Sequence, residues 1–407
     1  MKALVLAGGF PQIALLQELK SRDIYTVLAD YYPNPVAKPY ADKFYQESTL
    51  NVEAITEIAR AENVDFLITA CTDQALLTVA KVSETLGLPC YIDYQTALNV
   101  TNKQYMKKVF AKNGIPTAAF AVMGEFDENK TKDMRFPLIV KPVDCNSSKG
   151  VKKVINKDEL TAAFYNAVKL SRTDTAIVEE YIVGEELSAD IYIEDGRAHV
   201  LSVSSLDKIA NNDKFVIFRG FYSQEKTESV RGLITEIAQK IATAFNIKNS
   251  PMLIQMIYDG TSAYVLEFSA RTGGGVKYYF IRKVCGFDVI SAVVDLTFGN
   301  KPNLALKEPE NKYISNEFIY CSPGIFKKLV GFDELKAEGI ISEYCLFKRE
   351  GAVFSEIENS GDRIAGYTVQ ADTMEELNKK RREAVRRMRV IGEDGRDLMR
   401  RDLLEDI

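Results

Sequence analysis

Two oxygen-bearing side chains, Gln255 and Glu267, lie in the segment MLIQMIYDGTSAYVLEF, on either side of the turn signal Asp259-Gly260. The apolar residues around that turn predict a β-hairpin over 252–258 and 263–268. Cross-strand neighbours on one face of a hairpin converge on a single cation. Magnesium often takes one or two protein oxygens and completes its shell with phosphate and water. The pair therefore predicts a magnesium site, and two isolated polar side chains on a hairpin are the alternative.

Ser269 and Arg271 follow Glu267 at alternate positions, and three glycines occupy 273–275. If the strand continues, the three side chains point to the same side of the sheet. An arginine in that place can clamp a phosphoryl group during its transfer. The glycines give a backbone that a ligand can approach closely.

A phosphate cradle is predicted after the apolar strand PLIVK, which ends at Lys141. The small polar loop 144–150 follows and contains Ser147 and Ser148. A strand-end lysine beside a loop rich in N–H and hydroxyl groups suits a polyphosphate, and a solvent-exposed strand end is the alternative. The chain has no GxxxxGK[ST] motif, which excludes a P-loop.

The segment VEEYIVGEELSAD predicts two strands joined by a short hinge, with Glu179 and Glu186 on either side of it. The backbone amides of such a hinge can pair with the edge of an adenine. Carboxylates accept hydrogen bonds from an amino group or from ribose hydroxyls. A pair of surface acids on a hairpin is the alternative interpretation.

The elements that position these residues follow from hydrophobic periodicity. Apolar runs at 2–7, 24–29, 64–70 and 88–92 predict strands, and helical patterns near 11–22, 51–62 and 73–86 lie between them. This alternation is typical of a parallel, doubly wound sheet. Further helices are predicted at 102–113, 158–170, 227–246 and after the capping box TMEE at 373–376. The basic run of the last helix indicates a solvated or interface face rather than a nucleic-acid site.

Composition narrows the classes of function. The chain has 407 residues, of which 46% are apolar and 27% charged, with a net charge of −5. No apolar run approaches the ~20 residues of a membrane span, and the negative charge disfavours nucleic-acid binding. Six scattered cysteines without a CxxC motif predict free thiols in a reducing cytoplasm. The single histidine, His199, is expected on a strand surface, and mechanisms that need a histidine pair are excluded.

The order and spacing of these motifs resemble the ATP-grasp superfamily over most of the chain. The resemblance is carried by TNKQYMKKVFAKNGIPT, PLIVKP, VEEYIVGEELS, VLEFSARTGGG, GFDVISAVVDLTFG and IAGYTVQADTMEELNKKRREAV. The last segment is similar to the small terminal domain of the biotin-carboxylase-like branch. The resemblance implies a mixed α/β and α+β fold. A parallel doubly wound domain would span 1–100, an ATP-grasp domain 101–305 with a lid at about 115–182, and a small α+β domain 306–407.

The resemblance also implies a nucleotide site. The implied ATP contacts are Lys103 and Lys141 on phosphates, Ser147 and Ser148 in the phosphate loop, Glu179 on the adenine amino group, Tyr181 and Ile182 at the hinge, Glu186 on ribose, and Leu266 on the adenine face. Gln255 and Glu267 would bind Mg2+ or Mn2+, and Arg271 would steady an acyl phosphate. The family usually has asparagine where this chain has Ser269, which weakens the expectation of a second metal.

Substrate contacts are expected from Asp73 at a helix start, Arg219 in a loop facing the cleft, Gly274 in the triglycine and Lys277 after it. Each has an ordinary alternative, such as a helix cap for Asp73 or an exposed loop cation for Arg219.

The implied activity is an ATP-dependent carboxylate–amine ligase. It forms an acyl phosphate and then an amide, and it releases ADP and phosphate. Its partners would be a small-molecule carboxylate and amine, and a homodimer is compatible with the resemblance. An ATP-dependent carboxylase or carbamoyl-phosphate-type enzyme of the same fold is one alternative. A non-catalytic nucleotide-binding protein is the other, although binding without chemistry needs neither Glu267 nor Arg271.

Overall fold

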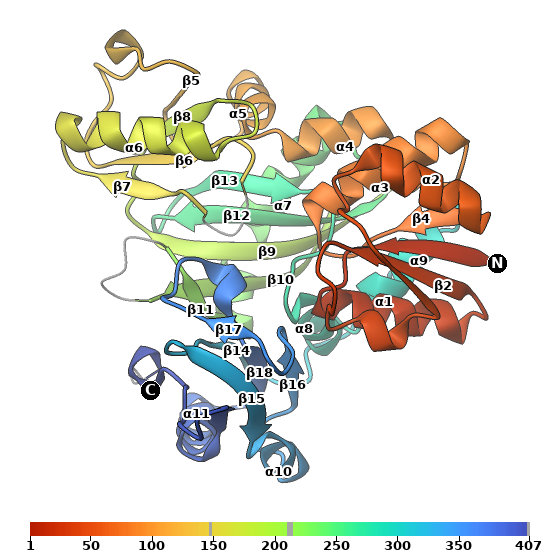
Figure 1. Cartoon of the computed structure of the whole chain (residues 1–407). Coiled ribbons are helices and arrows are strands. Elements are labelled where there is room, and N and C mark those ends of the chain that lie inside the picture. The colour runs from red at the N-terminus through yellow and green to blue at the C-terminus, as the bar shows by residue number, and fades with distance from the viewer. Residues whose placement is uncertain (146–148, 210–214, 405–407) are drawn as a thin grey trace.

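The computed structural model describes residues 1–145, 149–209 and 215–404. In these ranges, the strands form a parallel sheet at the N-terminus, a small antiparallel sheet, an eight-stranded central sheet and a three-stranded sheet near the C-terminus. Figure 1 shows the small antiparallel sheet above one end of the central sheet and the N-terminal sheet beside the other end. None of the helices described has both the length and the apolar character that crossing a membrane requires.

The N-terminal sheet has the order β3-β2-β1-β4, and all of its strand pairs are parallel. Its strands are β1 (Lys2–Leu6), β2 (Tyr25–Asp30), β3 (Lys43–Gln46) and β4 (Phe66–Ile68). The helices around it are α1 (Phe10–Ser21), α2 (Val52–Glu62) and α3 (Asp73–Leu86). Continuous apolar runs form these strands because helices cover both faces of a parallel sheet. The predicted doubly wound arrangement is confirmed.

The predicted strand at 88–92 is wrong. These residues run as irregular chain between α3 and α4 (Tyr94–Thr101). Pro89 lacks the N–H that a ladder needs, and Tyr91 turns away to donate its hydroxyl to the carbonyl of Ala270 over 3.1 Å. The fourth strand of the sheet is instead β3, which lies at the edge opposite β4 and has the short and partly exposed sequence KFYQ.

The small antiparallel sheet, which we call the lid sheet, has the order β5-β8-β6-β7. Its elements are β5 (Phe120–Met123), β6 (Leu138–Pro142), β7 (Lys152–Val154), β8 (Ala176–Glu180) and the covering helix α6 (Lys157–Leu170). Asn156 caps α6 by accepting a hydrogen bond from the N–H of Glu159. The apolar face of α6 and the inner face of the sheet form one core, so the lid is held together by its own packing.

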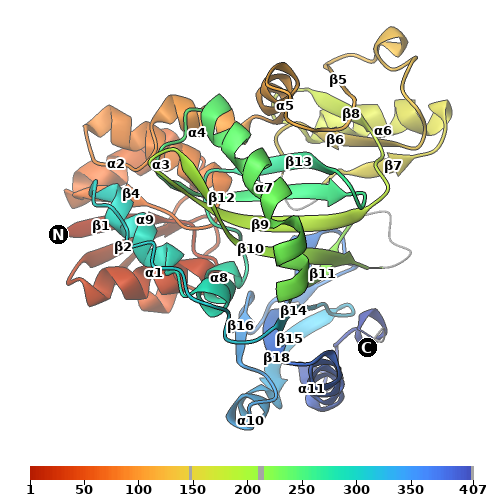
Figure 2. The ribbon, with the colours of Figure 1, turned by 180° about the vertical axis from the view of Figure 1, so that it is seen from behind.

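The central sheet has the order β13-β12-β9-β10-β11-β14-β18-β16. Its strands are β9 (Glu185–Glu194), β10 (Arg197–Lys208), β11 (Ile217–Ser223), β12 (Ser250–Tyr258), β13 (Ala263–Ser269), β14 (Tyr313–Ile319), β16 (Glu343–Leu346) and β18 (Ala365–Ala371). Helix α7 (Gln224–Ala244) crosses the rear face of the sheet, as Figure 2 shows. Helix α5 (Lys103–Lys112) contacts α7. The apolar side chains of one face pack against α7, which leaves the other face for the functional site.

The C-terminal part extends the central sheet through β14, β18 and β16 and adds the three-stranded sheet. Its remaining elements are β15 (Gly324–Val330), β17 (Val353–Phe354), β19 (Arg389–Gly392), α10 (Phe332–Ala337) and α11 (Met374–Arg387). Short 3-10 turns occur at Lys38–Tyr40, Glu128–Lys130, Ser360–Asp362 and Arg401–Leu403. Thr373 caps α11, as its sequence predicts.

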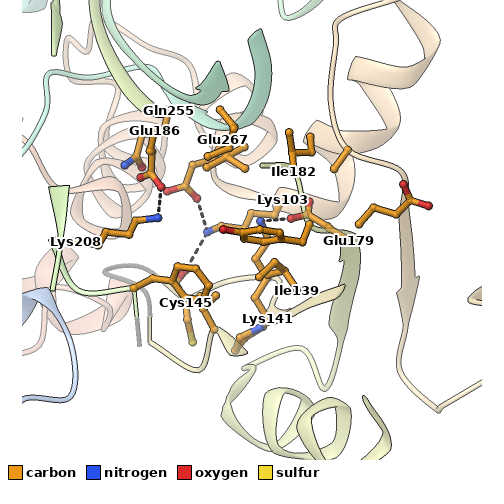
Figure 3. Close-up of a pocket in the computed structure, with 18 of the residues that line it drawn as sticks. Lys103, Ile139, Lys141, Cys145, Glu179, Ile182, Glu186, Lys208, Gln255 and Glu267 are labelled. Carbon is orange, nitrogen blue, oxygen red and sulfur yellow. Dashed lines mark hydrogen bonds and ion pairs between the residues drawn. The ribbon is translucent and has the colours of Figure 1, made fainter. Parts of the chain in front are cut away.

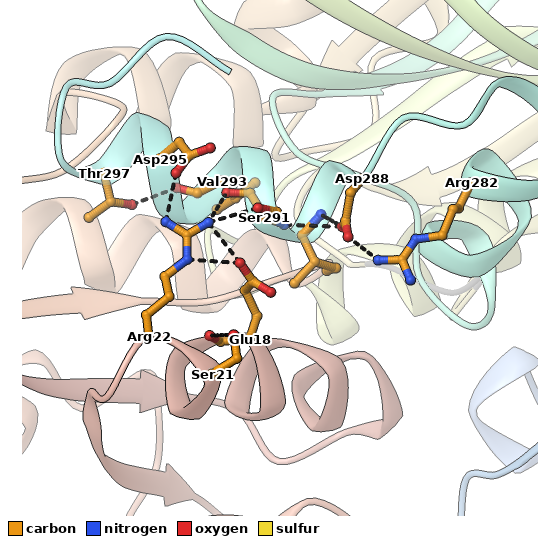
Figure 4. Close-up of polar contacts among 10 residues, drawn as sticks. Glu18, Ser21, Arg22, Arg282, Asp288, Ser291, Val293, Asp295 and Thr297 are labelled. Atoms are coloured by element: carbon orange, nitrogen blue, oxygen red, sulfur yellow. Dashed lines mark hydrogen bonds and ion pairs between the residues drawn. The ribbon is translucent and has the colours of Figure 1, made fainter. Parts of the chain in front are cut away.

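Two helices return from the central sheet to the N-terminal sheet: α8 (Lys277–Cys285) and α9 (Val289–Thr297). Helix α9 packs against α1, and Figure 4 shows Arg22 reaching from the end of α1 to α9. The Arg22 guanidinium donates to Asp295 over 2.6 Å and to the Ser291 hydroxyl over 2.7 Å. This contact fixes the N-terminal sheet against the central sheet, so that the start of α3 faces the end of β13.

Candidate nucleotide and metal site

A pocket lies between the lid sheet and the end of the central sheet (Figure 3). It brings together Lys103, Lys141, Glu179, Tyr181, Ile182, Glu186, Gln255, Leu266 and Glu267, all of which the sequence singled out. These residues come from α5, β6, β8, the β8–β9 connection, β9, β12 and β13. Segments separated by more than 160 residues thus supply one pocket with several cations, several carboxylates and an apolar wall.

Glu179 lies between two lysines at the back of the pocket. Its two carboxylate oxygens are each 2.6 Å from an ammonium group, one on Lys107 and one on Lys141. Glu179 and Lys107 are almost completely buried, and Lys107 also donates to the hydroxyl of Thr117 over 2.5 Å. Burial opposes ionisation of Glu179, but the charges of Lys107 and Lys141 outweigh it and lower the pKa of Glu179 to about 2. The buried group is therefore a carboxylate at neutral pH.

The ion pairs of Glu179 predict that the free energy of unfolding decreases at acid pH. The pKa of Glu179 is about 2 in the folded chain, below its ordinary 4.5. Its contribution is therefore complete above about pH 5 and is lost as the pH falls toward 2, because the unfolded chain then binds the proton more tightly. We expect the stability difference between wild type and Glu179→Gln to shrink steadily between pH 5 and pH 3. Urea unfolding at several pH values measures this difference, and a difference independent of pH would contradict the assignment.

The connection between β8 and β9 forms the hinge side of the pocket, with Tyr181 and Ile182 on its lining. Gly184 passes so close to β12 that a Cβ there would lie 2.5 Å from the carbonyl oxygen of Tyr258, which only glycine avoids. Leu266, with Ile139 from β6, adds apolar surface. Such a slot between two sheets has the shape and polarity for a flat, aromatic base.

Glu186 lies at the opposite wall and forms an ion pair with Lys208 (Figure 3). The Lys208 ammonium also lies over the ring of Phe215, 4.8 Å from its centroid. Both residues line the pocket. The structure thus places Glu186 in the lining of the pocket, and its role as an acceptor for ribose hydroxyls remains a prediction.

Gln255 and Glu267 are direct cross-strand partners on β12 and β13, as the hairpin predicts. The Lys103 ammonium lies 3.0 Å from the Glu267 carboxylate and donates to the Cys145 carbonyl over 2.9 Å. Burial opposes ionisation of Glu267, but Lys103 and Lys141 lower its pKa, so the group is a carboxylate at neutral pH. Among the described residues, no group of three or more His, Cys, Asp or Glu side chains is placed so that it could hold a metal ion. One carboxylate and one amide oxygen fit a magnesium ion that takes its other ligands from phosphate and water.

Ser269 and Arg271 continue from Glu267 toward the N-terminal sheet, and Asp73 meets them there. The Arg271 guanidinium forms a two-pronged ion pair with Asp73, with one N–H···O distance of 2.9 Å. Burial opposes ionisation of Asp73, but Arg271 outweighs it and lowers the pKa of the carboxyl. The structure therefore joins the predicted catalytic arginine to a predicted substrate residue, and Asp73 holds Arg271 from the start of α3.

The triglycine leads into α8, where Lys277 lies close to the central sheet. The Lys277 ammonium is 2.9 Å from Asp190 on β9 and 3.0 Å from the Ser204 hydroxyl on β10. Gly274 lies beside the backbone of Cys71, since a Cβ there would be 4.0 Å from the Cys71 carbonyl oxygen. Gly274 thus lies beside the segment that leads to Asp73, the partner of Arg271.

The prediction of Arg219 as a loop cation is wrong in its placement. Arg219 lies on β11, is 8% exposed, and donates to Glu317 over 3.0 Å and to Asp207 over 2.9 Å. Arg381 of α11 binds the same Glu317 over 2.7 Å. The spacing of these residues in the sequence does not reveal this buried network, which connects the central sheet with the C-terminal helix. Ser147 and Ser148 lie outside the described residues.

The sequence analysis missed two lysines of the site: Lys107, which pairs with Glu179, and Lys208, which lines the pocket. Lys107 follows Lys103 by four positions, so both lie on one face of α5, and this spacing is the signal that could have identified it. Lys208 closes β10 ahead of an undistinguished polar stretch and carries no comparable signal. His199 lies on β10, as predicted, with its Nε2 3.7 Å from Glu194.

Comparison with known proteins agrees with this geometry. Residues 134–278 match the family model described as an ATP-grasp domain. The L-arginine-specific L-amino acid ligase of Bacillus subtilis is 22% identical over 345 residues, which cover 81% of this chain and 82% of that protein. A carbamoyl phosphate synthase large chain of Clostridium botulinum is 24% identical over 308 residues. The match covers 72% of this chain but 28% of that protein.

The fold agrees over the whole length with a solved structure. The crystal structure of L-amino acid ligase from Bacillus licheniformis superposes with a TM-score of 0.78 at 20% identity, over 96% of this chain and 98% of that one. The lid sheet, the central sheet and the N-terminal parallel sheet are therefore parts of one known architecture.

Proposed function

We propose that this chain, whose residues 134–278 form an ATP-grasp domain, is an ADP-forming ligase that joins a carboxylate to an amine. The observation that carries the proposal is the pairing of Gln255 with Glu267 at the mouth of the pocket, with Lys103 and Lys141 beside them and Arg271 just beyond. Cations, oxygen ligands and an arginine are arranged in the order that phosphoryl transfer needs.

Each group of residues has a separate role in the proposed reaction. The apolar slot and the hinge hold the base, and Lys103 and Lys141 exchange their present carboxylate partners for phosphate oxygens. Gln255 and Glu267 hold magnesium or manganese, which neutralises phosphate charge when bound. Arg271, held by Asp73, faces the carboxylate as its oxygen attacks the γ-phosphorus. Positioning and charge stabilisation account for most of the catalysis, so a chain with one histidine can perform it.

Two ion pairs, both made by cations that follow β13 in the chain, support free amino acids as substrates. Arg271 pairs with Asp73, and Lys277 pairs with Asp190. Alternating positive and negative groups match a zwitterion, which offers both an ammonium and a carboxylate. The Bacillus subtilis relative is itself named as an L-amino acid ligase. A cytoplasmic location and a homodimer remain predictions from the sequence.

The test is ADP and phosphate release from Mg-ATP across a panel of amino acids, singly and in pairs, with hydroxylamine as a trap. We expect release that depends on a carboxylate, together with a hydroxamate that identifies it. Stimulation by bicarbonate alone would favour the carboxylase or carbamoyl-phosphate-type reaction. ATP binding without any turnover over the panel and bicarbonate would support a non-catalytic protein and contradict the proposal.

A further inference from the structure

Two rows of side chains cross the same face of the central sheet. In the first, which we call the metal row, Ser188, Gln255 and Glu267 are register partners on β9, β12 and β13. In the second, which we call the inner row, Asp190, Leu253 and Ser269 are partners on the same strands. The rows are two residues apart, so their side chains point the same way at about 7 Å separation along the strands. The inner row thus lies beside the place where phosphoryl transfer is proposed.

Asp190 is the charged member of the inner row, and one of its oxygens is free. It is 2% exposed, and its Oδ2 accepts hydrogen bonds from the Ser202 hydroxyl over 2.6 Å and from Lys277 over 2.9 Å. Its Oδ1 has no hydrogen-bond partner within the described ranges. A buried carboxylate oxygen without a donor is costly, so its retention calls for an explanation.

The free oxygen faces the triglycine. A Cβ built on Gly273 would lie 3.5 Å from Asp190 Oδ1 and 2.8 Å from Cγ of Lys277. Arg271, which is proposed to face the acyl phosphate, is only two residues before Gly273. The unpaired oxygen is therefore close to the backbone that directly follows Arg271.

The other carboxylates of the site also have cationic partners, and Glu186 pairs with Lys208. Glu179 has one lysine on each oxygen, both oxygens of Asp73 bind Arg271, and Glu267 faces Lys103 in the metal row. An amine substrate is an ammonium ion at neutral pH. It needs a carboxylate acceptor for binding and must lose a proton before it attacks. Asp190 has a negative charge and an unpaired oxygen beside Gly273, so it can both bind the ammonium group and accept a proton from it.

We propose, on the basis of the ligase function above, that Asp190 binds the ammonium group of the amine substrate and takes a proton from it. Lys277 and Ser202 hold the carboxylate in position through Oδ2. Proton transfer leaves a neutral amine, whose lone pair forms the new C–N bond at the acyl carbon. The bond from that carbon to the phosphate oxygen breaks, and the second proton leaves nitrogen for the departing phosphate. Asp190 returns its proton to solvent when the product leaves.

The experiment compares two nucleophiles on the same acyl phosphate. Hydroxylamine is uncharged at neutral pH and need not lose a proton before it attacks, whereas the ammonium group of an amino acid must. In Asp190→Asn, we expect hydroxamate formation to persist while the ratio of amide to hydroxamate falls about 100-fold, the usual size of a general-base contribution. Residual amide formation should rise about tenfold per pH unit, because it then depends on the free amine in solution. Asp190→Glu should restore part of the ratio.

Asp195→Asn is the matched control, since Asp195 closes the same β9–β10 hairpin and pairs with the exposed Lys301. It should leave the ratio unchanged. Asp190→Asn combined with Lys277→Gln removes both buried charges and keeps the test usable if the single variant is unstable. A parallel loss of hydroxamate and amide, or an unchanged ratio, would overturn the role of Asp190. If wild type forms neither product with any pair, the proposed ligase function itself fails.

Discussion

Glu267→Gln is expected to reduce ATP turnover about 1,000-fold, the upper range for loss of one preorganised electrostatic group in a reaction centre. Gln keeps an oxygen near Lys103 but removes the negative charge that a magnesium ion requires at the end of β13. ADP binding without magnesium should persist, because the apolar slot and the hinge remain. Calorimetric titration of ADP with and without magnesium tests this directly: wild type should bind more tightly with the metal, and the variant should lose that difference.

Glu185→Gln is the control for this prediction. Glu185 is the first residue of β9, directly after the connection from β8, and it pairs with Lys226; neither residue lines the pocket. Its replacement should leave both turnover and the magnesium effect on ADP binding intact. Full turnover by Glu267→Gln, with wild-type stability, would contradict the metal assignment.

Glu179→Gln is expected to have the largest effect on stability, a loss of about 3–5 kcal/mol in the free energy of unfolding, typical of a broken buried ion pair. Glu179 is 2% exposed and is the counter-charge for both Lys107 and Lys141. Without it, two ammonium groups lie close together in the interior. Urea unfolding measures the loss, and nucleotide affinity should fall as well, because Lys141 lines the pocket.

The next residue along β8 supplies the control. Glu180 pairs with Arg135, whose side chain is 89% exposed, over 3.4 Å. A pair with so exposed an arginine contributes about 0–1 kcal/mol. Gln keeps an oxygen that can accept the hydrogen bond from the Arg135 backbone N–H, so Glu180→Gln should change stability little. Equal losses in the two variants would show that the two lysines do not depend on Glu179.

Local patterns predicted much of this architecture, and the reasons are visible in particular elements. The Gln255–Glu267 pairing follows from a hairpin whose turn fixes the register of both strands. The positions of Lys141 near the end of β6 and of the hinge after β8 could be predicted because the apolar runs that form these two strands have well-defined ends. Helix α11 begins where its capping box places it. In each case, the information lies within about twenty residues.

Contacts between distant segments could not be predicted in this way. The Asp73–Arg271 pair spans 198 positions and exists because α9 binds α1 and fixes the N-terminal sheet beside β13. Arg219 looked like a loop cation because its partner, Glu317, is 98 positions away on β14. The irregular course of 88–92 depends on a hydrogen bond from Tyr91 to Ala270, also far along the chain. Such contacts between segments far apart in the chain become visible only in three dimensions.

The most direct test of the ligase assignment is isotope transfer from a substrate carboxylate labelled with oxygen-18 on both oxygens. After a single turnover with Mg-ATP and an amine, mass spectrometry of the released phosphate reports which bond was made. An acyl phosphate intermediate places one labelled oxygen in the inorganic phosphate, with unlabelled ADP as the other nucleotide product. Unlabelled phosphate, or label recovered in AMP with release of pyrophosphate, would contradict the account.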